Sequence, residues 1–95
     1  MKVIFIVSYK LKPGTRKEYL QTIRLLKTKM QEIGKNYDVY EQKNKDTYYE
    51  IYFCESYEEY DSLDENLPEH IQNLIDSLKH YVLGEINYQT LIQLE

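Results

Sequence analysis

The sequence is poor in the residues that build most cofactor sites. It has one cysteine, three glycines, two prolines and no tryptophan. A single thiol, Cys54, cannot form an internal disulfide, which is typical of a protein of the reducing cytoplasm. So few glycines do not make a glycine-rich phosphate loop, and His70 and His80 lack the spacing of zinc ligands. We therefore expect no metal ion and no nucleotide cofactor.

Long apolar runs are also absent. The longest uninterrupted run near the start, Val3–Val7, has five residues, which is too short for the core of a signal peptide or for a membrane span. We expect this run to be a β-strand and expect no membrane association. The chain has 95 residues without repeats or linkers, so we expect one domain covering residues 1–95.

Charge is unevenly distributed. Residues 1–45 carry eleven Lys/Arg and four Asp/Glu, whereas residues 46–95 carry one Lys and twelve Asp/Glu. A basic half is a feature of nucleic-acid-binding proteins, but the net charge is −4, and phosphate binding needs cations. We instead expect the basic first helix to attract the acidic second helical region beside it, with each exposed pair worth about 0–1 kcal/mol.

The order of hydrophobic periods predicts the fold. Apolar and polar residues alternate as in strands in four segments, and they repeat as in helices in two. The strands are expected at Lys2–Leu11, Tyr37–Gln42, Thr47–Glu55 and Ile86–Leu94, and the helical regions at Thr15–Ile33 and Ser56–Leu83. This βαββαβ order predicts an α+β, ferredoxin-like sandwich with both helical regions on one face of an antiparallel sheet.

Turn and cap residues support these boundaries. Thr15 with Glu18 and Ser56 with Glu59 have the spacing of capping boxes. Gly34 and Gly84 are placed to end the two helical regions. The polar stretch 43–46 is expected to turn the chain between the second and third strands, and Pro68 is expected to start a new helix after an interruption at 64–66.

RNA-recognition modules share this strand order and stack bases on aromatic residues of the third strand. Their pattern has a basic residue and a glycine ahead of the aromatic residues, where this chain has Asp46 and Thr47. We therefore expect no nucleic-acid partner.

Tyrosine is the abundant aromatic residue, with eleven copies against two phenylalanines. A tyrosine combines an apolar ring with a polar tip and suits pockets for aromatic ligands as well as interfaces. Most copies are explained by strand propensity and packing at the rim of the sheet. We select Tyr9, Tyr48 and Tyr52 as candidate pocket residues, together with Glu50 and His70 as candidate ligand-binding residues. Individual catalytic residues stay unassigned.

Several short motifs carry a resemblance to a known family. They are the opening strand Val3–Val7, Pro13-Gly14 before a long helix, Tyr49-Glu50-Ile51-Tyr52 on the third strand, and Ser56–Tyr60 with His70 downstream. On these motifs the whole chain resembles the dimeric α/β-barrel superfamily, in particular small proteins like the antibiotic biosynthesis monooxygenases. The resemblance implies that two sheets pair into a barrel across a homodimer. It also implies oxidation of aromatic compounds without a metal or flavin. Haem-degrading relatives use an Asn, Trp and His set, and this chain has no tryptophan.

We therefore expect a homodimer that acts as a cofactor-independent, monooxygenase-like protein on a small aromatic compound. In such an enzyme a tyrosine or histidine moves protons. The alternative is a module of the same fold that binds a small ligand or a protein and has no catalytic activity.

Overall fold

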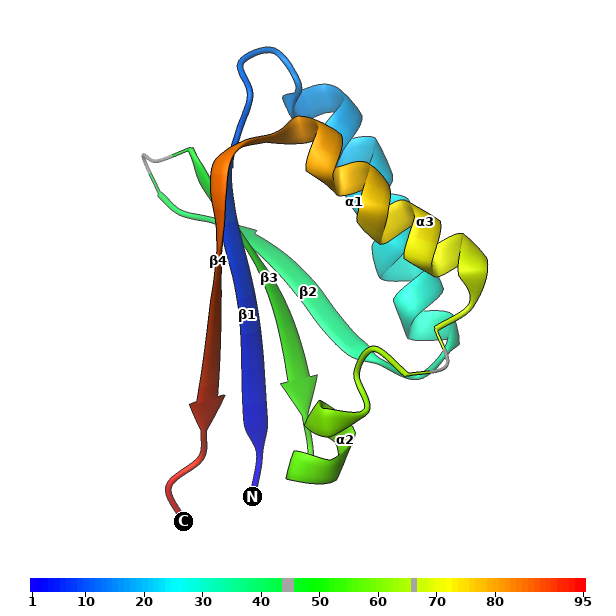
Figure 1. The fold of residues 1–95 in the computed structure, drawn as a ribbon, viewed down its shortest axis with the longest axis vertical. Helices are drawn as coiled ribbons and strands as arrows, with labels where there is room; N and C mark the ends of the chain where they lie inside the picture. The colour runs from blue at the N-terminus through cyan, green and yellow to red at the C-terminus, as the bar shows by residue number, and fades with distance from the viewer. Residues whose placement is uncertain (44–45, 66) are drawn as a thin grey trace.

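The computed structural model describes residues 1–43, 46–65 and 67–95. A four-stranded antiparallel sheet has the order β2-β3-β1-β4, and the helices cover one of its faces (Figure 1). The elements are β1 (Val3–Leu11), α1 (Arg16–Glu32), β2 (Asn36–Glu41), β3 (Thr47–Cys54), α2 (Tyr57–Asp61), α3 (Glu69–Leu78), the single 3₁₀ turn η1 (Lys79–Tyr81) and β4 (Val82–Ile92). The predicted ferredoxin-like βαββαβ fold is confirmed.

Strand β1 lies in the middle of the sheet, as its apolar residues on both faces predict. It pairs with β3 on one side and with β4 on the other. Ile4, for example, lies opposite Phe53 of β3 and Leu91 of β4. Successive residues of a strand point to opposite faces of the sheet. Val3, Phe5, Val7 and Tyr9 therefore point to the helices, and Ile4 and Ile6 point to the other face.

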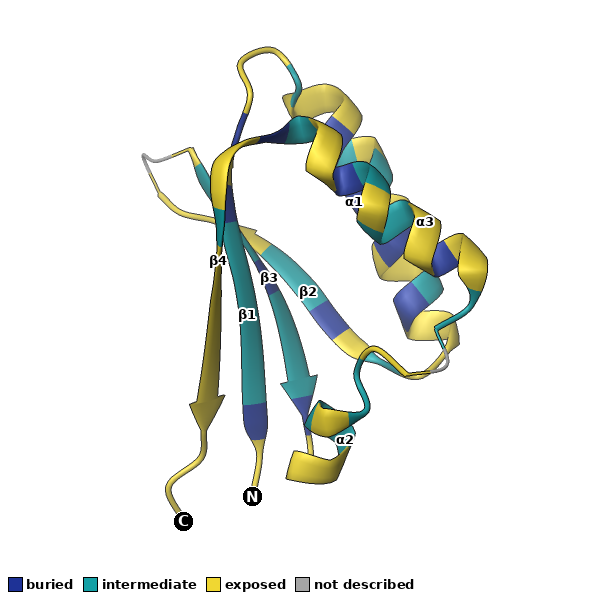
Figure 2. Ribbon diagram, in the orientation of Figure 1, coloured by how far each residue is buried: buried dark blue, intermediate teal, exposed yellow. Residues whose placement is uncertain are grey.

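The core lies between the sheet and the pair α1 and α3, which run side by side (Figures 1 and 2). Helix α1 contributes Tyr19, Leu26 and Met30, and α3 contributes Ile71 and Leu78. These residues repeat at helical spacing, so one stripe of each helix is removed from water. Within the described residues, neither helix nor any other is long and apolar enough to cross a lipid bilayer.

Two of the four predicted caps are present. Gly34, with φ of +77°, closes α1, and the amides of Gly34 and Lys35 donate to Gln31 and Met30 carbonyls as in a Schellman motif. The Ser56 hydroxyl accepts from the Glu59 amide at 3.1 Å. The capping box predicted at Thr15 is wrong, because its hydroxyl donates backwards to the Lys12 carbonyl at 2.7 Å.

The second helical region differs most from the prediction. It is divided into α2, α3 and η1, and the last strand begins at Val82 rather than Ile86. Gly84 does not end a helix but lies within β4 at φ of +77°. Three residues of β4, Gly84–Ile86, lie opposite one residue of β1, Tyr9. A bulge of this kind needs a residue that tolerates positive φ, which is why glycine stands there. The predicted turn at 43–46 includes residues 44 and 45, and the interruption at 64–66 includes residue 66. These three lie outside the described residues.

The expected ion pairs between α1 and the acidic region are not formed among the described residues. Helix α1 pairs instead with the edge strand β2. Lys27 Nζ lies 2.8 Å from Asp38 Oδ1, and Arg16 Nε lies 3.3 Å from Glu41 Oε2. Helices α1 and α3 meet through apolar side chains. The basic residues of α1 therefore face solvent or β2.

Candidate functional site

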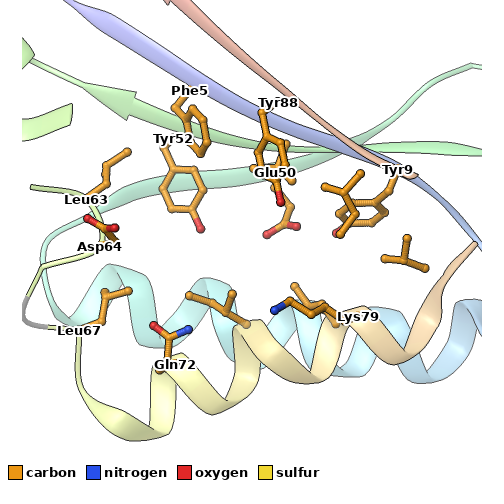
Figure 3. A pocket seen from close by; sticks show the side chains of 15 residues that line it. Phe5, Tyr9, Glu50, Tyr52, Leu63, Asp64, Leu67, Gln72, Lys79 and Tyr88 are labelled. Atoms are coloured by element: carbon orange, nitrogen blue, oxygen red, sulfur yellow. The ribbon is translucent and has the colours of Figure 1, made fainter. Parts of the chain in front are cut away.

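A cavity of about 230 Å³ lies between the sheet and α3 (Figure 3). The sheet side comes from β1, β3 and β4, and the opposite side comes from α3 and the segment that precedes it. Most of the lining is apolar. Its polar residues are Tyr9, Glu50, Tyr52, Asp64, Gln72, Lys79 and Tyr88, and its apolar residues are Phe5, Val7, Leu63, Leu67, Ile75, Leu78, Val82 and Ile86.

Strand alternation explains why these side chains meet. Phe5 and Val7 of β1 lie opposite Tyr52 and Glu50 of β3, so all four point toward the helices. Tyr88 of β4 lies opposite Val7 on the other side. In the alternation of β3, the one acidic residue therefore falls on the buried face of the sheet.

Glu50 is the central polar group of the cavity. Its side chain is directed away from the sheet into the cavity (Figure 3), and the residue is only 5% exposed. The Tyr37 hydroxyl donates a hydrogen bond to Glu50 Oε1 at 2.6 Å. Burial raises the pKa of Glu50, and the hydroxyls of Tyr37 and Tyr9 offset part of that increase. A carboxylate with a raised pKa is a stronger base than an exposed one.

Tyrosines surround this carboxyl group. The hydroxyls of Tyr9 and Tyr19 share a hydrogen bond of 2.8 Å, and the rings of Tyr37 and Tyr52 lie 4.9 Å apart. Burial, and then the charge of Glu50, raises the pKa of Tyr9 and of Tyr52 well above the ordinary value. Both phenols therefore stay protonated at physiological pH and can donate a hydrogen bond to a ligand.

Three of the five candidate residues meet in the cavity, namely Tyr9, Glu50 and Tyr52. Tyr48 points to the same side of the sheet but lies beyond the cavity, where its ring packs on Tyr19 with 5.1 Å between centroids. Its hydroxyl accepts from Arg16 Nε at 3.1 Å. His70 is exposed on α3 and does not line the cavity.

Asp64, Gln72 and Lys79 line the cavity but were not among the predicted residues. The acidic stretch around Asp64 was expected only to attract the basic first helix. The available signal was the break before Pro68, because connections between helices often carry binding residues. Tyr37 was also missed, since only the structure brings β2 beside Glu50.

No three His, Cys, Asp or Glu side chains of the described part of the chain lie close enough together to hold a metal ion. Cys54 is buried, and burial raises the pKa of its thiol. The thiol is therefore a packed side chain and not an activated nucleophile.

The Glu50→Gln variant is expected to lose part of the pH dependence of stability. The folded-state pKa of Glu50 is raised above 4.5. Its contribution to the free energy of unfolding is therefore fully present below the unfolded pKa and is lost as pH rises through the folded pKa. Each tenfold difference in proton affinity between the two states corresponds to about 1.4 kcal/mol. Glutamine still accepts from Tyr37 but does not titrate.

Urea unfolding from about pH 4 to pH 8 measures this effect, because the slope of stability against pH reports the difference in bound protons. Relative to Glu50→Gln, the wild type should lose stability as pH rises. Glu85→Gln, at an exposed position of β4, is the matched control. A constant difference between wild type and Glu50→Gln over this range would contradict the prediction.

The sequence matches no protein-family profile and no curated protein. Solved structures do match over nearly the whole chain. Rv0793 from Mycobacterium tuberculosis has a TM-score of 0.79 at 17% identity, covering 100% of this chain and 97% of that one. A structure described as an antibiotic biosynthesis monooxygenase has a TM-score of 0.78 at 17% identity, covering 98% and 99%. The chain has the antibiotic biosynthesis monooxygenase fold.

A third structure that matches is that of a protein described as an oxygenase. A mutant of SnoaB, a cofactor-independent oxygenase from Streptomyces nogalater, has a TM-score of 0.73 at 10% identity, covering 99% of this chain and 94% of that one. At these identities the likeness establishes the fold alone, because one fold hosts many different activities.

Proposed function

We propose that the chain is a cofactor-independent oxygenase and that its cavity binds a small hydroxylated aromatic compound. The observation that carries the proposal is the buried carboxyl group of Glu50, held by Tyr37 and directed into an otherwise apolar cavity. A titratable group with a perturbed pKa in an apolar pocket is a common property of active sites. The cofactor-independent activity of SnoaB, which shares the fold, supports the reaction class.

The lining supports an aromatic substrate of modest size. The rings of Phe5 and Tyr52 lie 5.9 Å apart, and those of Phe5 and Tyr88 are stacked at 6.2 Å. Aromatic side chains of this kind bind a planar ring through stacked or edge contacts. A volume of about 230 Å³ lies below the usual range for drug-sized ligands, which favours one or two fused rings.

In the proposed reaction Glu50 is the general base. Its carboxylate accepts the proton of the substrate hydroxyl, and the resulting phenolate is electron-rich at a ring carbon. That carbon forms a bond with O₂, the O–O bond then breaks, and the ring hydrogen is lost as a proton. The phenol and O₂ give a quinone and water, so that the substrate itself is oxidised and O₂ is reduced. The phenols of Tyr9 and Tyr52 donate hydrogen bonds to the oxygen that gains charge.

Oxygen uptake with naphthols and related phenols tests this function. Glu50→Gln is expected to lower kcat by about 100-fold or more, which is the range for removal of a general base. His70→Ala should leave turnover unchanged, since His70 is exposed and away from the cavity. Turnover that survives Glu50→Gln would contradict the proposal. Binding without turnover in the wild type would favour the alternative, a non-catalytic ligand-binding module.

We also propose that two copies pair through the uncovered face of the sheet. All the helices lie on the other face (Figure 1), and the uncovered face carries apolar side chains in three adjacent strands. They are half-buried or exposed in the single chain and comprise Ile4, Ile6, Tyr49, Ile51, Phe53 and Leu91. A contiguous apolar surface of this kind is typical of an interface. Pairing around a two-fold axis covers the apolar face of both copies at once.

A further inference from the structure

The charged residues of the cavity are separated along its length. Figure 3 shows Asp64 near Leu63 and Leu67 at one end, whereas Lys79 lies further along, across the cavity from Glu50. Among the residues that the structure describes, Lys79 is the one cationic side chain of the lining. A negatively charged ligand group is therefore repelled at the Asp64 end and attracted at the Lys79 end.

Lys79 is only loosely engaged in the structure. Its ammonium group lies 3.7 Å from Asp76 Oδ1, and the two side chains are 67% and 53% exposed. Exposed pairs of this kind contribute about 0–1 kcal/mol, so a ligand can take the place of Asp76 at little cost. Asp76 also accepts from Gln72 Nε2 at 3.3 Å, so it keeps a partner when Lys79 turns to the ligand.

Glu50 does not form an ion pair with Lys79 either. The hydrogen bond to the Glu50 carboxyl group comes from the Tyr37 hydroxyl, on the sheet side of the cavity. The cavity thus presents a carboxyl group held by tyrosine on one wall and an ammonium group on the opposite wall. A ring bound between them can direct a hydroxyl group to Glu50 and a second, anionic substituent to Lys79.

We propose that Lys79 determines specificity and that the preferred ligand is a hydroxylated aromatic carboxylate, with its carboxylate paired to Lys79. This inference rests on the proposed function for the role of the hydroxyl group. The ammonium–carboxylate contact is a charge-assisted hydrogen bond, which is stronger than the contact that a neutral ester oxygen makes. Lys79 touches the substrate but takes no part in proton transfer.

Calorimetric titration with a hydroxynaphthoic acid and with its methyl ester tests the proposal, because the two probes have nearly the same shape and differ in charge. The wild type should bind the acid about tenfold more tightly than the ester. Lys79→Gln should remove this preference and leave the affinity for the ester within about twofold. Lys17→Gln, which removes the same charge from an exposed position of α1, should retain the preference. Circular dichroism checks that each variant is folded.

Equal affinity of the wild type for acid and ester, or an unchanged preference in Lys79→Gln, would overturn the proposal. If turnover is detected, Lys79→Gln should raise KM for the acid and leave kcat unchanged. The binding result does not depend on turnover. Oxygen uptake that requires Glu50 but shows no preference for the acid would refute the role of Lys79 and retain the oxygenase. A charge preference without oxygen uptake would retain Lys79 and refute the oxygenase.

Discussion

The Tyr19→Ala variant is expected to be about 3–5 kcal/mol less stable than the wild type, the usual cost of removing a buried aromatic ring. Tyr19 is 0% exposed, and its ring packs against those of Tyr9, Tyr48 and Tyr81 at centroid distances of 6.0, 5.1 and 6.3 Å. Its loss leaves a cavity between α1 and the sheet. Because small domains have stabilities of only about 5–15 kcal/mol, much of the net stability disappears. Urea unfolding followed by circular dichroism measures the difference.

One further variant separates the ring from the hydroxyl group, and another is a control on the same helix. Tyr19→Phe keeps the ring and removes the hydrogen bond of 2.8 Å to the Tyr9 hydroxyl. Because Tyr9 keeps Glu50 as a partner, the expected cost is about 0.5–1.5 kcal/mol. Leu25→Ala lies on the same helix, where Leu25 is 47% exposed, and should change stability by less than about 0.5 kcal/mol. The prediction fails if Tyr19→Ala costs no more than Leu25→Ala.

The Ile6→Glu variant is expected to be monomeric at concentrations where the wild type is a dimer. Ile6 lies in the central strand on the uncovered face, opposite Ile51 of β3 and Gln89 of β4. A glutamate there would be buried at the proposed interface without a partner, once in each copy. An uncompensated buried charge costs about 3–5 kcal/mol, so the two copies together weaken association by several orders of magnitude.

Light scattering at micromolar concentration distinguishes the two states. The wild type should have about twice the chain mass of 11.6 kDa, and Ile6→Glu should have the single mass with an unchanged circular dichroism spectrum. Lys17→Glu introduces the same residue on α1, on the opposite side of the sheet, and should stay dimeric. A folded wild type of single mass would show that the apolar face is not an interface between copies. A dimeric Ile6→Glu would show that another surface forms the interface.

The central position of β1 was predicted correctly from the period of its residues. Ile4 and Ile6 alternate with Phe5 and Val7, and a strand with apolar residues on both faces has to be central in its sheet. The helical period of α3 would also have predicted that His70 is exposed. Ile71 lies on the buried stripe of α3, and a neighbour one position away on a helix turns by about 100° from it. The exposure of His70 therefore follows from the pattern.

The residues that depend on contacts between elements were not predictable. Gly84 was expected to end a helix, yet a helix end and a β-bulge both select glycine for the same reason, its tolerance of positive φ. Only the pairing of β4 with β1 decides between them. Lys79 follows α3 directly, where a basic residue is usually explained by the helix dipole. Its place in the cavity depends on how far α3 stands from the sheet.

The strand order also has a consequence for how the protein is made. Strand β1 is synthesised before its partner β4, and the helices lie between the two in the sequence, so the central strand keeps an unpaired edge until β4 is made. Val82 and the partly buried Ile86 complete the core at the same late stage. Open strand edges are where chains pair with one another by mistake, and contacts distant in sequence form slowly. A ribosome that stalls before β4 is finished would therefore release a chain prone to aggregation, and chaperones that cover β1 would be of most use during that interval.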